Sequence, residues 1–156
     1  MITYLRVAVA GLLTLLVQWI VLGRLSVFGA YPDAVMLFVA WIGLQFGRRA
    51  GSIAGFILGT LMDAVYGTWG IHMILKTITG FLLGMFSPED RDILVISPRQ
   101  AIMGGMVVGI LHNGLHVAFL TLQVGAVNPE SVLALWPGSA IYSALVATIA
   151  AFFATR

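Results

Sequence analysis

Glycine recurs at every fourth position along one apolar stretch of this chain, and the stretch ends at the acid Asp63. The glycines that share this spacing are Gly43, Gly47, Gly51, Gly55 and Gly59. In a water-soluble helix each of them would cost about 1 kcal/mol relative to alanine. Helices in lipid instead associate where small residues let their backbones approach, and a spacing of four places such residues on one helix face. The stretch therefore predicts close helix packing in a membrane protein.

The composition also indicates a membrane protein. Of the 156 residues, 60% are hydrophobic and 9% are charged, and the mean hydropathy is +1.04. Soluble domains carry about 25% charged residues, and a soluble chain of this size could not bury so much apolar surface. Because there is no cysteine, disulfides, thiol catalysis and cysteine-ligated metals are excluded. The net charge of +2 comes from scattered basic residues, so no nucleic-acid partner is expected.

Six apolar segments approach the length that a hydrocarbon core of about 30 Å requires. We expect the spans at residues 5–23, 33–46, 50–66, 71–86, 101–124 and 132–153. The second segment is short, so a tilted or partly re-entrant helix is expected there. The predicted fold is a single all-α, polytopic membrane domain over residues 1–156, with no soluble domain and no linker long enough to hold one.

The basic residues predict the orientation of these spans. If six segments alternate across the membrane, Arg24 lies on the side opposite to the N-terminus. The residues on the side of the N-terminus are Arg6, Arg48, Arg49, Arg91, Arg99 and Arg156. Positive residues mark the cytoplasmic side of a membrane. Both termini are therefore expected in the cytoplasm, together with the polar loop from Ser87 to Gln100.

Besides Arg6 and Asp33 at the very starts of their segments, two charged residues fall inside the predicted spans. Asp63 lies near the outer end of the third span and Lys76 near the outer end of the fourth, and a rise of about 1.5 Å per residue gives them similar depths. We therefore expect a pair. An unpaired charge in lipid costs at least about 2.5 kcal/mol, so both side chains should face the bundle or a cavity. Two interpretations stay open: the charges serve structure, with Asp63 capping a helix end as one variant, or they line a functional pocket.

Two histidines share one face of the fifth segment. His112 and His116 are four residues apart, and Asn113 adds polarity beside them. Interhelical hydrogen bonding or the lining of a polar cavity is expected, because a zinc site needs a third ligand and the glutamate of HExxH is absent. No catalytic triad, paired carboxylates or nucleotide motif is present either. We predict no metal, no cofactor and no enzymatic activity.

Several of these residues also form a family pattern. It comprises a proline at the start of the second span, a G-x-x-x-G-F-x-x-G-x-x-x-D run, a glycine turn and a K-T-x-x-G element. The matching residues are Pro32, Asp33, Gly55, Phe56, Gly59, Asp63, Lys76 and Thr77. On this pattern the chain resembles the MreD family of bacterial rod shape-determining membrane proteins.

The resemblance implies a non-enzymatic scaffold of the elongasome, the inner-membrane machinery of lateral peptidoglycan synthesis and cell shape. The implied partner MreC would bring a transmembrane helix to a glycine groove and a periplasmic part to the outer loops. This groove comprises Gly43, Gly47, Gly51, Gly55, Gly59, Gly80 and Gly84. The elongation glycosyltransferase, the penicillin-binding transpeptidase and, indirectly, MreB are further implied partners.

The implied fold is similar to that of the substrate-binding subunits of energy-coupling-factor (ECF) vitamin transporters. An alternative function therefore stays open, in which the chain is a small-solute-binding membrane subunit of a transporter. Glycine-rich helix faces and a few intramembrane polar groups suit both functions.

Overall fold

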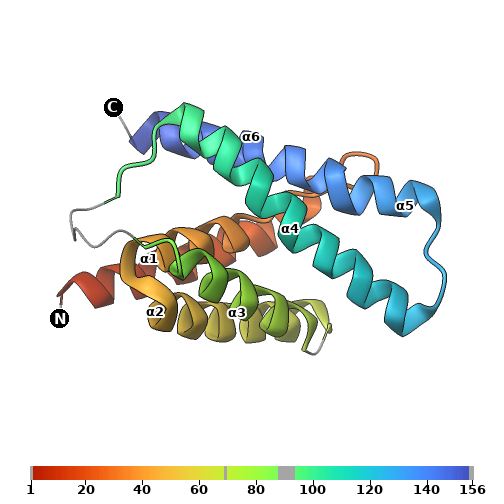
Figure 1. Cartoon of the computed structure of the whole chain (residues 1–156), viewed down its shortest axis with the longest axis horizontal. Coiled ribbons are helices and arrows are strands. Elements are labelled where there is room, and N and C mark those ends of the chain that lie inside the picture. Colours follow the sequence, from red (N-terminus) through yellow and green to blue (C-terminus); the bar gives the residue numbers. More distant parts are fainter. Residues whose placement is uncertain (1, 69, 88–93, 155–156) are drawn as a thin grey trace.

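The computed structural model describes residues 2–68, 70–87 and 94–154, which form a bundle of helices (Figure 1). The helices are α1 (Ile2–Ile20), η1 (Leu22–Arg24), α2 (Ala34–Tyr66), α3 (Ile71–Gly84), α4 (Pro98–Val124), α5 (Pro129–Leu133), η2 (Ala134–Gly138) and α6 (Ser139–Ala154). Over these ranges, β pairing is limited to an isolated bridge between Val27 and Ala30. The prediction of an all-α fold is confirmed. Arg91 and Arg156, used to predict orientation, and part of the loop from Ser87 to Gln100 lie outside the described residues.

Helix α2 consists of two helical segments that meet at Gly47. This residue has φ +83° and ψ 179°, a backbone region that is essentially restricted to glycine. The segments fold back on each other, because a Cβ built on Gly51 would lie 2.8 Å from Cα of Gly43. Figure 1 shows this reversal in the ribbon of α2. The break falls between the spans predicted at 33–46 and 50–66, and Gly47 makes the turn instead of packing against a neighbouring helix.

The other glycines of the stretch bring α2 against α3. A Cβ on Gly55 would collide with the carbonyl of Lys76, and one on Gly59 would lie 2.5 Å from the carbonyl oxygen of His72. On the facing helix, a Cβ on Gly84 would lie 2.5 Å from Cα of Arg48. Gly43 and Gly51 face Gly80 in the same way. The glycine groove that the sequence offered to a partner is therefore filled by α3 of the same chain.

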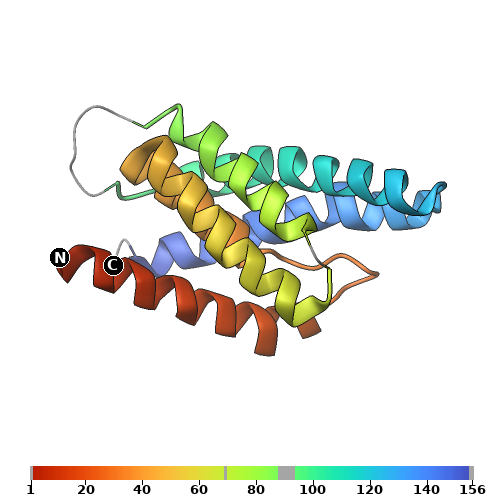
Figure 2. The same cartoon turned by 90° about the horizontal axis from the view of Figure 1, so that it is seen from below.

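Small residues also join α4 to α6. A Cβ on Gly109 would lie 2.8 Å from Cα of Ala140, and one on Gly105 would lie 3.0 Å from Cα of Ala144. Figures 1 and 2 show α4 and α6 as a layer beside the one formed by α1, α2 and α3. In both views the described ends of the chain lie at the same end of the bundle. An even number of membrane crossings is expected from this arrangement.

The apolar core connects the two segments of α2 to the helices around them. One cluster joins Leu15 of α1 to Val35 and Val39 of the first segment and to Leu58 and Met62 of the second. A second cluster joins the first segment to Val108 of α4. The folded-back α2 therefore lies at the centre of the bundle.

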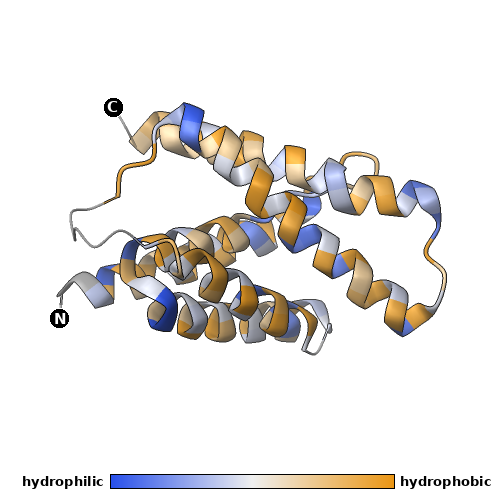
Figure 3. Ribbon diagram, viewed as in Figure 1, coloured by the Kyte–Doolittle hydropathy of each residue, from blue (hydrophilic) through white to orange (hydrophobic). Residues whose placement is uncertain are grey.

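Three helical stretches in the described part of the chain are long and apolar enough to cross a membrane. They are Tyr4–Arg24, Pro98–Val124 and Pro129–Ala154, and Ile71–Gly84 is a shorter apolar helix. Figure 3 shows apolar residues along the helices and hydrophilic residues at helix ends and midway along α4. The six spans and their limits stay a prediction.

Candidate functional site

A buried ion pair joins α3 to the start of α2. Lys76 is fully buried, and its Nζ lies 2.5 Å from Oδ2 of Asp33. Asp33 is the N-cap residue of α2, and its Oδ1 accepts a hydrogen bond of 2.7 Å from the amide of Met36. The predicted pairing of Lys76 with Asp63 is therefore wrong. The anion that pairs with Lys76 is Asp33 at the start of α2, 43 residues earlier in the chain. The position of Lys76 along its own helix could not reveal this distant partner.

Asp63 instead holds the turn between α2 and α3. Its carboxylate accepts hydrogen bonds from the hydroxyl of Thr68 at 3.0 Å and from the amides of Gly70, His72 and Met73 at 3.0, 3.0 and 2.9 Å. Amides in the first turn of a helix have no intrahelical partner, and a negative charge there also interacts favourably with the helix dipole. Asp63 therefore caps α3, which is one of the roles that the sequence left open.

Gln18 of α1 fixes the backbone on either side of Asp33. Its Nε2 donates to the carbonyl of Pro32 at 2.9 Å, and its Oε1 accepts from the amide of Ala34 at 2.8 Å. The side chain is 1% exposed, so both bonds form away from solvent. The carboxylate of Asp33 is therefore held in place by its backbone as well as by Lys76.

Two serines of α6 hold the same segment from the other side. Oγ of Ser143 accepts a hydrogen bond of 3.0 Å from the amide of Asp33, and Oγ of Ser139 accepts one of 3.1 Å from the amide of Tyr31. Burial raises the pKa of the Tyr31 phenol to about 12, so this ring stays neutral beside the carboxylate. Contacts from α1, α3 and α6 thus converge on the first residues of α2.

Histidines and an asparagine extend this polar region over α3 and α4. His112 and Asn113 are both buried, and Nδ1 of His112 lies 3.2 Å from Oδ1 of Asn113. The rings of His72 and His116 are 5.7 Å apart between centroids. His72, His112 and His116 all interact electrostatically with Lys76 and Asp33. We call these residues the polar cluster: Asp33, His72, Lys76, His112, Asn113 and His116.

Three buried atoms of the polar cluster have no hydrogen-bond partner among the residues that the structure describes. They are Nδ1 of His72, Nε2 of His112 and Nδ2 of Asn113. A buried polar group left without a partner costs about 1–3 kcal/mol, and most such groups in native proteins are satisfied. Among the described residues, no three histidine, aspartate or glutamate side chains are grouped so that they could hold a metal ion. The arrangement is suited to a polar organic ligand that both donates and accepts hydrogen bonds.

Three residues that build this region were not predicted from the sequence. Gln18, Ser139 and Ser143 each lie in an apolar segment, where a buried polar side chain needs a partner. The serines are four residues apart and so share one face of α6. This spacing was the available signal, although it does not identify the segment that the serines contact.

A comparison with protein families identifies the kind of protein that carries this site. The model of a family described as the ECF-type riboflavin transporter, S component, matches residues 2–155. The chain belongs to this family. No solved structure and no protein of curated function matched the chain.

Membership of the S component family contradicts the function predicted from the sequence. The resemblance to MreD proteins is wrong, and so is the predicted scaffold role in peptidoglycan synthesis and cell shape. The predicted partners MreC, MreB, the glycosyltransferase and the transpeptidase are wrong for the same reason. Glycine spacing and a buried acid and base reflect how helices pack in lipid, so they recur in membrane proteins of different function.

Other predictions are confirmed by the same match. S components are transporter subunits, so the chain is not an enzyme, and it is a multi-pass protein of the inner membrane. The fold is similar to that of the ECF substrate-binding subunits, as expected.

Proposed function

We propose that this chain is the solute-binding membrane subunit of an ECF-type transporter and that its solute binds against the polar cluster. The unpartnered atoms of His72, His112 and Asn113 carry this proposal. A ligand that supplied partners to these atoms would remove an unfavourable contribution of about 1–3 kcal/mol for each of them. Ionisable groups inside a membrane bundle are also typical of solute and ion pathways.

Riboflavin, which the family description names, is the first solute to test. Its ring system carries carbonyl oxygens and an imide N–H along one edge. The carbonyls can accept from Nδ2 of Asn113, and the imide can donate to an imidazole nitrogen such as Nε2 of His112 in its acceptor form. A site built to hydrogen-bond a ligand rejects analogues that lack the matching groups, because its own polar atoms are then left unpaired.

The contacts of Asp33 order one side of the polar cluster before a ligand binds. The ion pair with Lys76 and the contacts from Gln18 and Ser143 already order this side of the polar cluster before a ligand arrives. Pre-ordered groups do not lose conformational entropy on binding. We therefore expect Asp33 and Lys76 to support the site while His112 and Asn113 contact the solute.

The proposal includes a partner and an orientation. A transporter S component implies further components, so we expect the chain to assemble with the energy-coupling module of an ECF transporter. We propose that both termini are cytoplasmic. The turn of α2 with Arg48 and Arg49 and the start of α4 with Arg99 lie at the same end of the bundle as the chain ends, which agrees with positive residues inside (Figure 2).

Riboflavin binding by the purified chain in lipid nanodiscs tests the proposal. We expect saturable quenching of flavin fluorescence, weakened tenfold or more by His112→Leu and by Asn113→Leu, since each removes a hydrogen bond to the ligand. Gln123→Leu is the matched control, because Gln123 is exposed near the end of the same helix. Binding that is unchanged in both variants would exclude the polar cluster as the site, and no binding to the unaltered chain would exclude riboflavin.

A further inference from the structure

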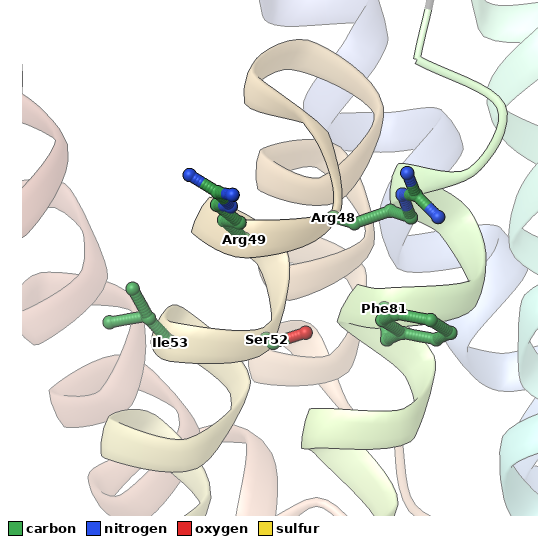
Figure 4. A pocket seen from close by; sticks show the side chains of 5 residues that line it. All are labelled: Arg48, Arg49, Ser52, Ile53 and Phe81. Carbon is green, nitrogen blue, oxygen red and sulfur yellow. The ribbon is translucent and has the colours of Figure 1, made fainter.

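A pocket lies at the opposite end of the bundle from the turn that Asp63 caps. It has a volume of about 480 Å³ and is lined by Arg48, Arg49, Ser52, Ile53 and Phe81. Figure 4 shows Arg48 and Arg49 at one end of the pocket, with their side chains extending to opposite sides of α2, Ser52 on the helix below them and Phe81 below Arg48. The volume falls within the range of pockets that hold small organic ligands.

The two arginines of this pocket have no anionic partner in the described part of the chain. The ion pair recorded there is the one between Lys76 and Asp33. Arg48 and Arg49 are both exposed and follow directly after Gly47, where α2 reverses. Guanidinium groups bind phosphate oxygens through two parallel hydrogen bonds, so adjacent arginines with no carboxylate favour a phosphate group.

Polarity along the pocket changes in the direction of membrane depth. From Arg48 to Ile53 the helix advances by about 7 Å at a rise of 1.5 Å per residue, so the apolar end of the pocket lies deeper in the bilayer. Ile53 and Phe81 are exposed at that end. A charged end at the interface and an apolar end toward the hydrocarbon match the headgroup and acyl chain of a phospholipid.

We propose that this pocket binds an anionic phospholipid of the cytoplasmic leaflet. Its phosphate group is held by Arg48 and Arg49, and its acyl chain lies along Ile53 and Phe81. Basic pockets between transmembrane helices on the cytoplasmic side are suited to anionic headgroups. The site is separate from the polar cluster, so it does not depend on which solute the chain carries.

Phosphatidylglycerol binding to the detergent-purified chain, followed by native mass spectrometry, tests this proposal. We expect retention of one phosphatidylglycerol in preference to phosphatidylcholine, and a decrease in affinity of tenfold or more in the double variant Arg48→Gln, Arg49→Gln. Arg99→Gln is the control, because Arg99 is exposed at the start of α4 and outside the pocket. Phe81→Ala should weaken binding of the full lipid without changing the binding of inorganic phosphate.

Three results would overturn the proposal. Equal retention of phosphatidylcholine would show that the arginines do not select an anionic headgroup. An equal loss in Arg99→Gln and in the double variant would show attraction to general surface charge. Binding of the purified energy-coupling module that requires Arg48 and Arg49, with no lipid selectivity, would assign the pocket to a protein partner. Circular dichroism of each variant establishes that it remains folded.

Discussion

Nζ of Lys76 and Oδ2 of Asp33 lie 2.5 Å apart, although the two residues belong to different helices and are 43 positions apart in the chain. Neither side chain is exposed to solvent to any large extent. The pair joins α3 to the beginning of α2, where Gln18 of α1 and Ser143 of α6 also make hydrogen bonds. The side chain of Asp33 and the backbone around it therefore connect α1, α2, α3 and α6 beside the proposed solute site.

Breaking this pair from one side should be strongly destabilising. Lys76→Met leaves a buried carboxylate without its cation, and we expect a loss of about 3–5 kcal/mol in the free energy of unfolding. The double variant Asp33→Asn, Lys76→Met should recover much of this loss, because asparagine still caps α2 and no charge remains buried. Unfolding in mixed micelles with increasing denaturing detergent measures the free energy of unfolding of the single and the double variant. A single variant as stable as the unaltered chain would contradict the role assigned to the pair.

Asp63 should be sensitive to a nearly isosteric change. In Asp63→Asn one of the two oxygens becomes an NH2 group that faces amide donors, so we expect a loss of about 1–3 kcal/mol in unfolding free energy. Thr68→Ala removes one of the four donors and should cost about 1 kcal/mol or less. The same unfolding assay compares the losses of unfolding free energy in Asp63→Asn and Thr68→Ala. If Thr68→Ala were the more damaging change, the carboxylate would not be the main constraint on this turn.

Two glycines on α4 should respond oppositely to alanine. A Cβ on Gly109 would lie 2.8 Å from Cα of Ala140, so Gly109→Ala must push α6 away and should destabilise the chain by about 1–3 kcal/mol. A Cβ on Gly104 would have no atom within 4 Å, so Gly104→Ala should be neutral or stabilising by up to about 1 kcal/mol. Unfolding free energies of the two variants provide the comparison. Equal effects would show that helix propensity, and not contact with α6, determines the role of these glycines.

Features that depend on local spacing were predictable from the sequence. The glycine spacing indicated close helix packing, and Gly55 and Gly59 do contact the backbone of α3. The hydrophobic runs indicated an all-α membrane protein. These inferences hold because side chains three or four residues apart share a helix face in any tertiary structure. They identify the face that packs but not the helix that packs against it.

Long-range partners could not be predicted in the same way. Lys76 and Asp63 are both buried, as their places inside apolar segments indicated, but burial alone does not select a partner. Asp63 had closer donors in the first turn of α3, whereas Asp33 was brought to Lys76 by contacts from α1 and α6. The family resemblance failed for a related reason, since the residues that matched it serve packing and capping in this fold. The unpartnered atoms of the polar cluster depend on these same long-range contacts.

The turn of α2 provides a last prediction, in which one substitution is made at two glycines. Both Gly47 and Gly67 have positive φ, and a Cβ added to either would have no atom within 4 Å, so sterics outside the backbone do not distinguish them. Their ψ angles do: Gly67 has φ 70° and ψ 24°, the left-handed region that asparagine tolerates, whereas Gly47 has ψ 179°, where essentially only glycine is found.

Gly47→Asn should therefore cost about 1–3 kcal/mol in unfolding free energy, and Gly67→Asn should cost well under 1 kcal/mol. The strain at position 47 is relieved if the two segments of α2 open, which separates Gly43 from Gly51. A cysteine pair placed across these segments in the otherwise cysteine-free chain should cross-link more slowly in Gly47→Asn than in Gly67→Asn. Equal stability and equal cross-linking rates in the two variants would mean that α2 does not reverse at Gly47 in the membrane.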